Sequence, residues 1–283
     1  MASESASVRD ALRVAPGTVN LAGYDTASTP LAPGKKAKTE QDADDNKPLL
    51  AELQERLHAE ASAGGQRSVL LVLQGIDTAG KGGVVDHVVS AFGPAGVRYT
   101  AFKKPTPEEQ AHHFLWRIRK ALPSPGAIGV FDRSHYEDVL VPRVHETIPE
   151  ADWQRRYVEI NDFETELAAS GTTVMKCYLH ISYAMQRERL LARLDDPTKH
   201  WKFRETDIDE RAFWSDYQAA YTAMLQHCSS PAAPWYIVPS DHKWYRNWAI
   251  GRLMTETLQE LGPRYPEGDL DLDRLRRRLQ PPY

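Results

Sequence analysis

Cysteine and long apolar runs are both scarce in this sequence of 283 residues. Only two cysteines occur, Cys177 and Cys228. This number excludes a fold held together by a set of disulfides and indicates a protein of a reducing compartment. No apolar stretch approaches the ~20 residues that a membrane-spanning helix requires. The first residues lack a basic region followed by an apolar core, so we expect no signal peptide. These absences together predict a cytoplasmic protein with no membrane partner.

Positive charge is not in excess either. The chain has 35 Lys and Arg against 39 Asp and Glu, a net charge of −4, which argues against a nucleic-acid partner. A polyanionic ligand would have to be met by local clusters of basic residues. The histidines lack metal-ligand spacing, and no Gly-x-Ser-x-Gly or Cys/His arrangement indicates nucleophilic catalysis.

Strand and helix patterns alternate along the chain, which predicts an α/β fold. We expect a mostly parallel sheet of five strands with helices on both faces, a three-layer sandwich. The predicted strands are residues 69–73, 96–102, 127–131, 172–180 and 235–239. The first predicted helix begins at Pro48. The other predicted helices span residues 84–91, 108–121, 149–170, 183–194, 209–226 and 244–261.

The two ends of the chain differ from this centre in composition. Residues 1–47 are rich in small and polar side chains, so we expect an arm that is partly disordered or draped over the surface. Residues 48–262 form the expected catalytic domain, with a helical lid at about 195–211. Residues 263–283 form a tail, in which residues 269–278 could make a short exposed helix.

A glycine-rich segment, Gly75-Ile-Asp-Thr-Ala-Gly-Lys-Gly82, follows the first predicted strand and precedes a helix. This order predicts a phosphate-binding loop, in which backbone N–H groups and Lys81 grip an anion. Gly82 stands where such loops usually carry the Ser or Thr that binds magnesium, and an acid, Asp77, lies within the loop. The alternative is an ordinary turn between strand and helix. The predicted contacts are Gly75, Thr78, Ala79, Gly80, Gly82 and Gly83.

A second motif begins with Asp132 at the end of the third predicted strand. An acid at this place in phosphate-loop proteins holds magnesium, and Asp132 and Asp77 could together replace the missing hydroxyl. Arg133 could meet a phosphate, and Glu137 could take part in binding. The alternatives are a helix N-cap for Asp132 and helix-start charges for Glu137 and Asp138.

Further basic residues lie beyond these two motifs. Arg189 and Arg193 share one helix face, and Lys199 and Lys202 follow in a basic, aromatic stretch typical of a lid that excludes water. A solvated helix face is the alternative for the two arginines. A softer cluster joins Lys103 and Lys104, after the second strand, to Arg117, for which we expect a phosphate contact.

These motifs, in this order, resemble the polyphosphate kinase 2 family. The matching pieces are GIDTAGKGG at residues 75–83, FDRSHYEDV at 131–139 and KHWKF at 199–203, and the resemblance covers about residues 48–262. It implies a P-loop kinase fold, with Asp77 and Asp132 as essential acids. It also implies that Lys81, Arg133, Arg189 and Arg193 bind phosphate. His135 and Glu137 resemble the class III branch, which implies that both AMP and ADP accept phosphate.

The resulting hypothesis is an enzyme that moves the terminal phosphoryl group of inorganic polyphosphate reversibly to ADP or AMP. Mg²⁺ on Asp77 and Asp132 is the expected cofactor. The expected partners are polyphosphate, ADP, AMP, ATP and other nucleotides, and the resemblance implies a homodimer or homotetramer. Two alternatives stay open: a kinase of nucleotides or nucleosides that uses ATP as donor, and a non-catalytic module that binds polyphosphate or nucleotides.

Overall fold

A parallel sheet forms the centre of the molecule. The computed structural model describes residues 7–15, 17–268 and 270–280, and within them five strands pair in the order β2-β3-β1-β4-β5. Every pairing between neighbours is parallel, which confirms the predicted sheet. The strands are β1 (Ser68–Gln74), β2 (Val97–Ala101), β3 (Ile128–Asp132), β4 (Thr172–His180) and β5 (Trp235–Pro239).

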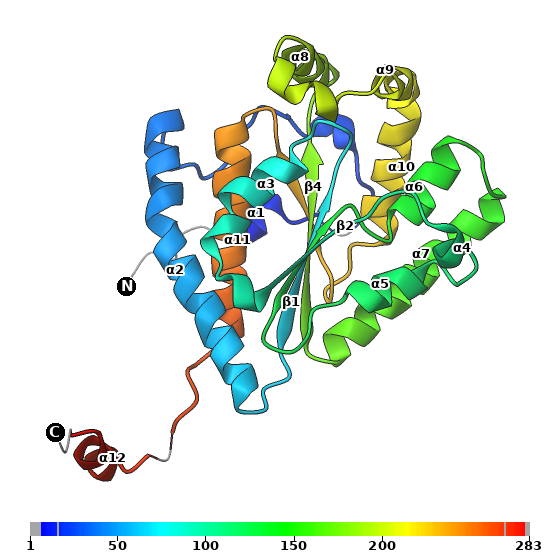
Figure 1. Ribbon diagram of the computed structural model, residues 1–283. Coiled ribbons are helices and arrows are strands. Elements are labelled where there is room, and N and C mark those ends of the chain that lie inside the picture. Colours follow the sequence, from blue (N-terminus) through cyan, green and yellow to red (C-terminus); the bar gives the residue numbers. More distant parts are fainter. Residues whose placement is uncertain (1–6, 16, 269, 281–283) are drawn as a thin grey trace.

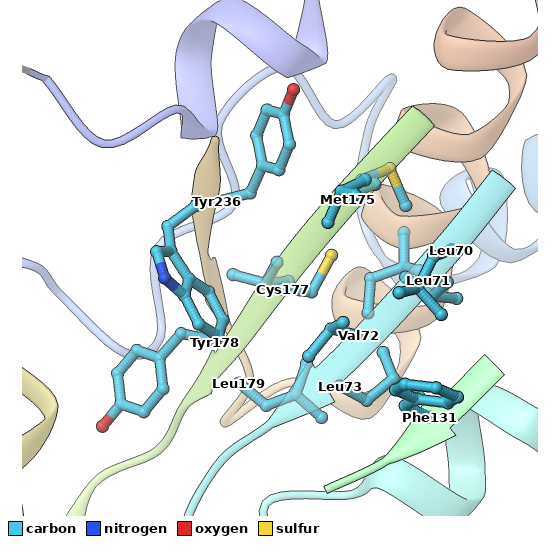
Figure 2. Packing of buried hydrophobic residues seen from close by; sticks show 14 of the residues in the cluster. Leu70, Leu71, Val72, Leu73, Phe131, Met175, Cys177, Tyr178, Leu179 and Tyr236 are labelled. Carbon is cyan, nitrogen blue, oxygen red and sulfur yellow. The ribbon is translucent and has the colours of Figure 1, made fainter. Parts of the chain in front are cut away.

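The central strand β1 is buried along its whole length, because helices cover both faces of the sheet. Figure 2 shows Leu71 and Val72 of β1 packed among side chains from the neighbouring strands β3 and β4. Cys177 of β4 lies in this core, and burial raises the pKa of its thiol well above the usual range. This thiol is therefore an inert packing group.

Helices form a layer on each side of the sheet, which confirms the three-layer architecture (Figure 1). One layer contains α1 (Val8–Leu12), α2 (Lys36–Ser62), α3 (Lys81–His87) and α11 (Lys243–Leu261). The other contains α5 (Leu115–Ala121), α6 (Glu137–Val144), α7 (Glu150–Ala169) and α10 (Trp214–His227). The helices α8 (Tyr183–Leu194) and α9 (Thr206–Asp209) lie at the carboxyl end of the sheet (Figure 1).

The helix predicted to begin at Pro48 begins at Lys36 instead, so that boundary was wrong. Polar contacts with α11 hold its additional turns. Asn46 donates to the hydroxyl of Thr255 at 2.8 Å, and the Trp248 indole donates to Asp42 at 2.7 Å. An apolar periodicity could not show these turns, because polar side chains make the contacts.

The helix predicted over residues 108–121 is interrupted, and α4 (Pro107–Gln110) and α5 flank the break. The His113 imidazole accepts the backbone N–H of Leu115 at 3.4 Å, and so competes with a continuous helix. A helix that we did not predict, α6, follows Asp132, and Glu137 and Asp138 occupy its first turn. These two acids are thus helix-start charges, whatever else they do.

The N-terminal segment crosses the outer edge of β5. The backbone N–H of Val14 donates to the Trp235 carbonyl at 2.9 Å, and Arg13 forms an isolated antiparallel bridge with Tyr236. Ser7 and the backbone of Val8 bond the Glu256 carboxylate, while Leu12 is buried. Residues 7–15 therefore pack on the domain, whereas residues 1–6 and 16 of the predicted arm lie outside the described residues.

The C-terminal segment extends away from the body of the molecule (Figure 1). It contains α12 (Leu272–Leu279), an exposed helix close to the one expected over 269–278, although residue 269 itself is outside the described part. Within the described residues, every helix is too short or too polar to cross a lipid bilayer.

Candidate active site

The glycine-rich loop joins β1 to α3 at the carboxyl edge of the sheet. Thr78 and Gly80 adopt left-handed backbone conformations, with φ of 66° and 109°. Left-handed residues in a tight turn direct neighbouring N–H groups to one side, which makes an anion-binding concavity. Thr78 is not a glycine, so its conformation stores strain that the surrounding structure must hold. The loop thus has the backbone shape that its sequence predicted.

Lys81 opens α3 and folds back over the loop. Its ammonium group is buried and donates to the Gly75 carbonyl at 2.8 Å. Burial lowers the pKa of Lys81, and the charge of Arg133 lowers it further, while Asp132, Asp77 and Glu137 oppose that shift. The lysine charge therefore lies within the field of both predicted metal-binding acids.

Asp77 and Asp132 come from adjacent strand ends. Asp132 ends β3 in register with Leu73 of β1, and Asp77 lies in the loop that follows β1. The hydroxyl of Tyr99 donates to Asp132 at 3.3 Å. Burial and the Asp132 charge raise the pKa of Tyr99 to about 12, so this donor keeps its proton.

The two carboxylates are the type of ligand that a hard divalent cation takes. Mg²⁺ keeps several waters and binds one or two protein carboxylates together with phosphate oxygens, so three protein ligands are not required. In the described residues, indeed, no cluster of three or more His, Cys, Asp or Glu side chains is placed for a metal. Both acids are partly open to solvent, and a Cβ added at Gly82 would meet no atom within 4 Å. The site therefore has space beside α3 where phosphate loops usually place a hydroxyl.

Arg133 directly follows Asp132 in a left-handed conformation, with φ of 63°. Its N–H donates to the Leu73 carbonyl at 3.0 Å, which ties the turn to the central strand. Its guanidinium lies 3.6 Å from Glu137 and remains 43% exposed, so it can still reach a ligand. Glu137 also accepts from Gln74 at 3.0 Å, which places this acid at the rim of the same site.

A buried polar cluster lies beneath this turn, and we call it the strand cluster: His135, Tyr136, Glu164 and Lys176. Lys176 forms an ion pair with Glu164 and donates to the Tyr136 hydroxyl at 2.9 Å. Tyr136 in turn donates to Glu164 at 2.8 Å, and His135 lies 3.1 Å from the same carboxylate. Sequence reasoning missed Lys176 and Glu164, although a lone lysine inside an apolar strand was a usable signal.

Arg193, near the end of α8, connects the predicted lid stretch to the loop. It donates to Asp77 at 3.0 Å and to the Lys202 carbonyl at 3.1 Å, and it lies 3.6 Å from Asp207. Arg193 therefore lies against the glycine-rich loop, and its charge faces the Asp77 carboxylate. The phosphate contact that we predicted for it stays a prediction.

Arg189, for which we predicted a phosphate contact, bonds the protein backbone. Its buried guanidinium donates to the carbonyls of Thr78 at 2.9 Å and Ala79 at 3.0 Å. It also bonds the carbonyls of Ser240 and Asp241. Arg189 thus holds the back of the loop, because its donors point to backbone oxygens.

Arg246 of α11 is a loop-supporting residue that sequence reasoning missed. It is 2% exposed and donates to the Ala79 carbonyl at 3.3 Å, so Arg189 and Arg246 bind the same oxygen. An arginine within an apolar helix pattern was the available signal. Its position behind the loop depends on packing between segments about 160 residues apart, which the sequence does not show.

The remaining predicted basic residues separate into two groups. Arg117 is buried, donates to Asp138 at 3.0 Å and to the Lys103 carbonyl at 2.9 Å, and so braces α5 against α6. The phosphate contact that we predicted for Arg117 stays a prediction. Lys103, Lys104, Lys199 and Lys202 are exposed. Lys199 pairs with Asp196 at 2.6 Å, and the Lys202 ammonium lies 4.9 Å from the centre of the exposed Trp201 ring.

Comparisons with known proteins point to one family. The sequence model of the family described as Polyphosphate kinase 2 matches residues 34–264. The AMP/ADP-polyphosphate phosphotransferase of Meiothermus ruber is 46% identical over 83% of this chain and 86% of its own. The ADP-polyphosphate phosphotransferase of Rhodopseudomonas palustris is 42% identical over 77% and 78%.

A solved structure extends the likeness to nearly the whole fold. The crystal structure of Polyphosphate Kinase 2 from Arthrobacter aurescens TC1 superimposes with a TM-score of 0.94. The two chains are 48% identical, and the match covers 96% of each.

Proposed function

The chain belongs to the polyphosphate kinase 2 family, and on that premise we propose that it transfers the terminal phosphoryl group of inorganic polyphosphate to ADP and AMP, reversibly. The observation that most supports this proposal is that Lys81, Asp77 and Asp132 lie together at the carboxyl ends of two adjacent strands. The relative from Meiothermus ruber carries both acceptors in its name, which supports AMP as well as ADP.

Transfer between two phosphate anions needs positioning and charge neutralisation more than proton transfer. The loop amides and Lys81 grip the donor phosphates, and Asp77 with Asp132 would hold Mg²⁺. When bound, that ion would supply a Lewis acid that offsets negative charge on the phosphate oxygens. Arg133, already at the rim and part-exposed, offsets the charge of the transferring group.

The lid excludes water from the phosphate site. Arg193 bonds Asp77 and the Lys202 carbonyl, so the stretch with Lys199 and Lys202 is held near the loop. Closing this stretch over the phosphates keeps water from consuming the donor. Lys103 and Lys104, exposed after β2, are the proposed contacts on the acceptor side, and Glu137 borders the same space.

A coupled assay tests this proposal. Polyphosphate, Mg²⁺ and either ADP or AMP are supplied, and the formation of ATP or ADP is measured, with EDTA as the metal control. Asp132→Asn should lower turnover about 10³-fold while thermal unfolding stays unchanged, the order of loss seen when one preorganised electrostatic group is removed. No transfer to either acceptor, or faster transfer from ATP than from polyphosphate, would refute it.

A further inference from the structure

Two arginines lie directly behind the phosphate loop, and the loop is shaped to receive one of them. A Cβ added at Gly80 or Gly83 would overlap the guanidinium of Arg246. Gly80 also has a φ of 109°, which side chains rarely adopt. Two of the loop glycines thus make room for Arg246 instead of for a ligand. Gly82 differs, because a Cβ there would meet nothing within 4 Å.

The two guanidinium groups contact neutral oxygens. Arg246 donates to the Ala79 carbonyl and, at 2.8 and 3.1 Å, to the side-chain oxygen of Asn247. Arg189 donates to the carbonyls of Thr78, Ala79, Ser240 and Asp241. Neither arginine forms an ion pair within 4.0 Å with a carboxylate of the described residues. Within the described residues, the two guanidinium groups behind the loop therefore have no carboxylate in direct contact with them.

Lys243 is a third basic group near the two arginines. Burial lowers the pKa of Arg246 to about 9, and the charge of Arg189 contributes to the shift. Burial also lowers the pKa of Lys243, and Arg189, Arg246 and Lys199 act on it in the same direction. Asp241 and Glu188 are the acids that oppose this trend at Arg189. Lys243 and Arg246 lie in the first turn of α11, where positive charge is unfavourable to a helix.

A protein seldom keeps buried, unneutralised cations unless they serve a ligand, because their desolvation opposes folding. We infer that Arg246 and Arg189 are positioning residues for the polyphosphate donor. They fix the Ala79 carbonyl on the back of the loop, so the N–H groups face the phosphates, and their unneutralised charge strengthens binding of a polyanion through the loop. This inference rests on the proposed function for the identity of the donor.

The test replaces Arg246 by Met, which removes the charge, and by Lys, which keeps it. Arg252→Met is the matched control, because Arg252 lies on the same helix and its guanidinium contacts Asn46 instead of the loop. We expect Arg246→Met to raise the KM for polyphosphate about 10-fold or more and to change the KM for ADP less than about 2-fold. Arg246→Lys should recover part of that loss.

Two further measurements distinguish a positioning role from a purely structural one. Adding guanidinium ion to Arg246→Ala should restore part of the polyphosphate affinity, which a general loss of folding would not allow. Calorimetric binding of tripolyphosphate, without nucleotide, should weaken about 10-fold in Arg246→Met. A lower thermal midpoint with an unchanged KM for polyphosphate and unchanged tripolyphosphate binding would overturn the inference.

The same data separate this inference from the proposed function. If the wild-type protein binds tripolyphosphate but transfers no phosphate, the proposed function fails, and the dependence of binding on Arg246 still decides the inference. If the wild-type protein turns over normally and both Arg246 variants match it, the inference alone is wrong.

Discussion

Buried cations occur in two parts of this protein, and their partners differ. In the strand cluster beneath Asp132, Lys176 is paired with the Glu164 carboxylate and bonded to Tyr136. Behind the phosphate loop, Arg189 and Arg246 meet backbone carbonyls and an amide oxygen. The first cluster is neutralised within the protein, whereas the second keeps its positive charge.

This difference separates groups that stabilise the fold from groups that prepare a site. A paired buried charge becomes a large liability only when one partner is removed. A buried positive charge without a paired carboxylate already opposes folding. Such a charge is expected at a site where a bound anion later neutralises it. The comparison thus predicts that mutations in the strand cluster lower stability, whereas mutations at the phosphate loop lower activity.

The largest expected effect is a loss of stability in the strand cluster. Glu164→Gln leaves the Lys176 ammonium buried without its carboxylate, which should lower the free energy of unfolding by about 3–5 kcal/mol. Chemical denaturation measures this change. The double variant Glu164→Leu with Lys176→Met should lose less than the sum of the single changes. Equal stability of Glu164→Gln and wild type would remove the contrast between the two regions.

The loop side should respond in the opposite way. Lys81→Met should lower kcat/KM about 10²–10³-fold, because a preorganised charge at the transferring phosphates is lost. Its thermal midpoint should not fall, since burial lowers the pKa of Lys81 and the charged form opposes folding. Steady-state kinetics and a thermal melt on one preparation check both halves. Full activity, or a melt that falls as far as that of Glu164→Gln, would contradict the comparison.

A smaller effect should distinguish two adjacent glycines of α3. Gly83→Ala places a methyl group against Arg246 and should cost about 1–3 kcal/mol, seen as lower stability or weaker polyphosphate binding. Gly82→Ala is its matched control, because the added methyl group has open space there. Similar behaviour of the two variants would show that Arg246 does not constrain the loop.

The smallest effect concerns pH. Burial alone would raise the pKa of Glu164, but Lys176 and His135 together lower it below its usual value. A carboxyl whose folded pKa is lowered contributes stability above its unfolded pKa, and that stability is lost as pH falls through the folded pKa. Stability should therefore decline below about pH 4.5, and less steeply in the Glu164→Leu, Lys176→Met double variant. Parallel curves for both proteins would exclude a contribution from this pair.

The sequence placed Asp77, Lys81 and Asp132 at strand ends because strand ends and a glycine-rich turn have recognisable local patterns. It did not show the protein contacts of Arg189 and Arg117, since charge and helical spacing show which face a residue occupies but not its partner. Arg246 and Lys176 were missed because burial of a cation depends on distant segments. The start of α2 was misplaced because polar contacts with α11, which leave no apolar periodicity, hold its first turns.

The crossing of β5 by the N-terminal segment has a consequence for handling the protein. β5 is an outer strand, and Val14 and Arg13 occupy part of its hydrogen-bonding edge. A shortened chain that starts near residue 17 would present that edge to solvent, where an extended strand of another molecule could add to it. We therefore expect such a chain to self-associate. Removing residues of the N-terminal segment because residues 1–47 are polar in composition would cause aggregation.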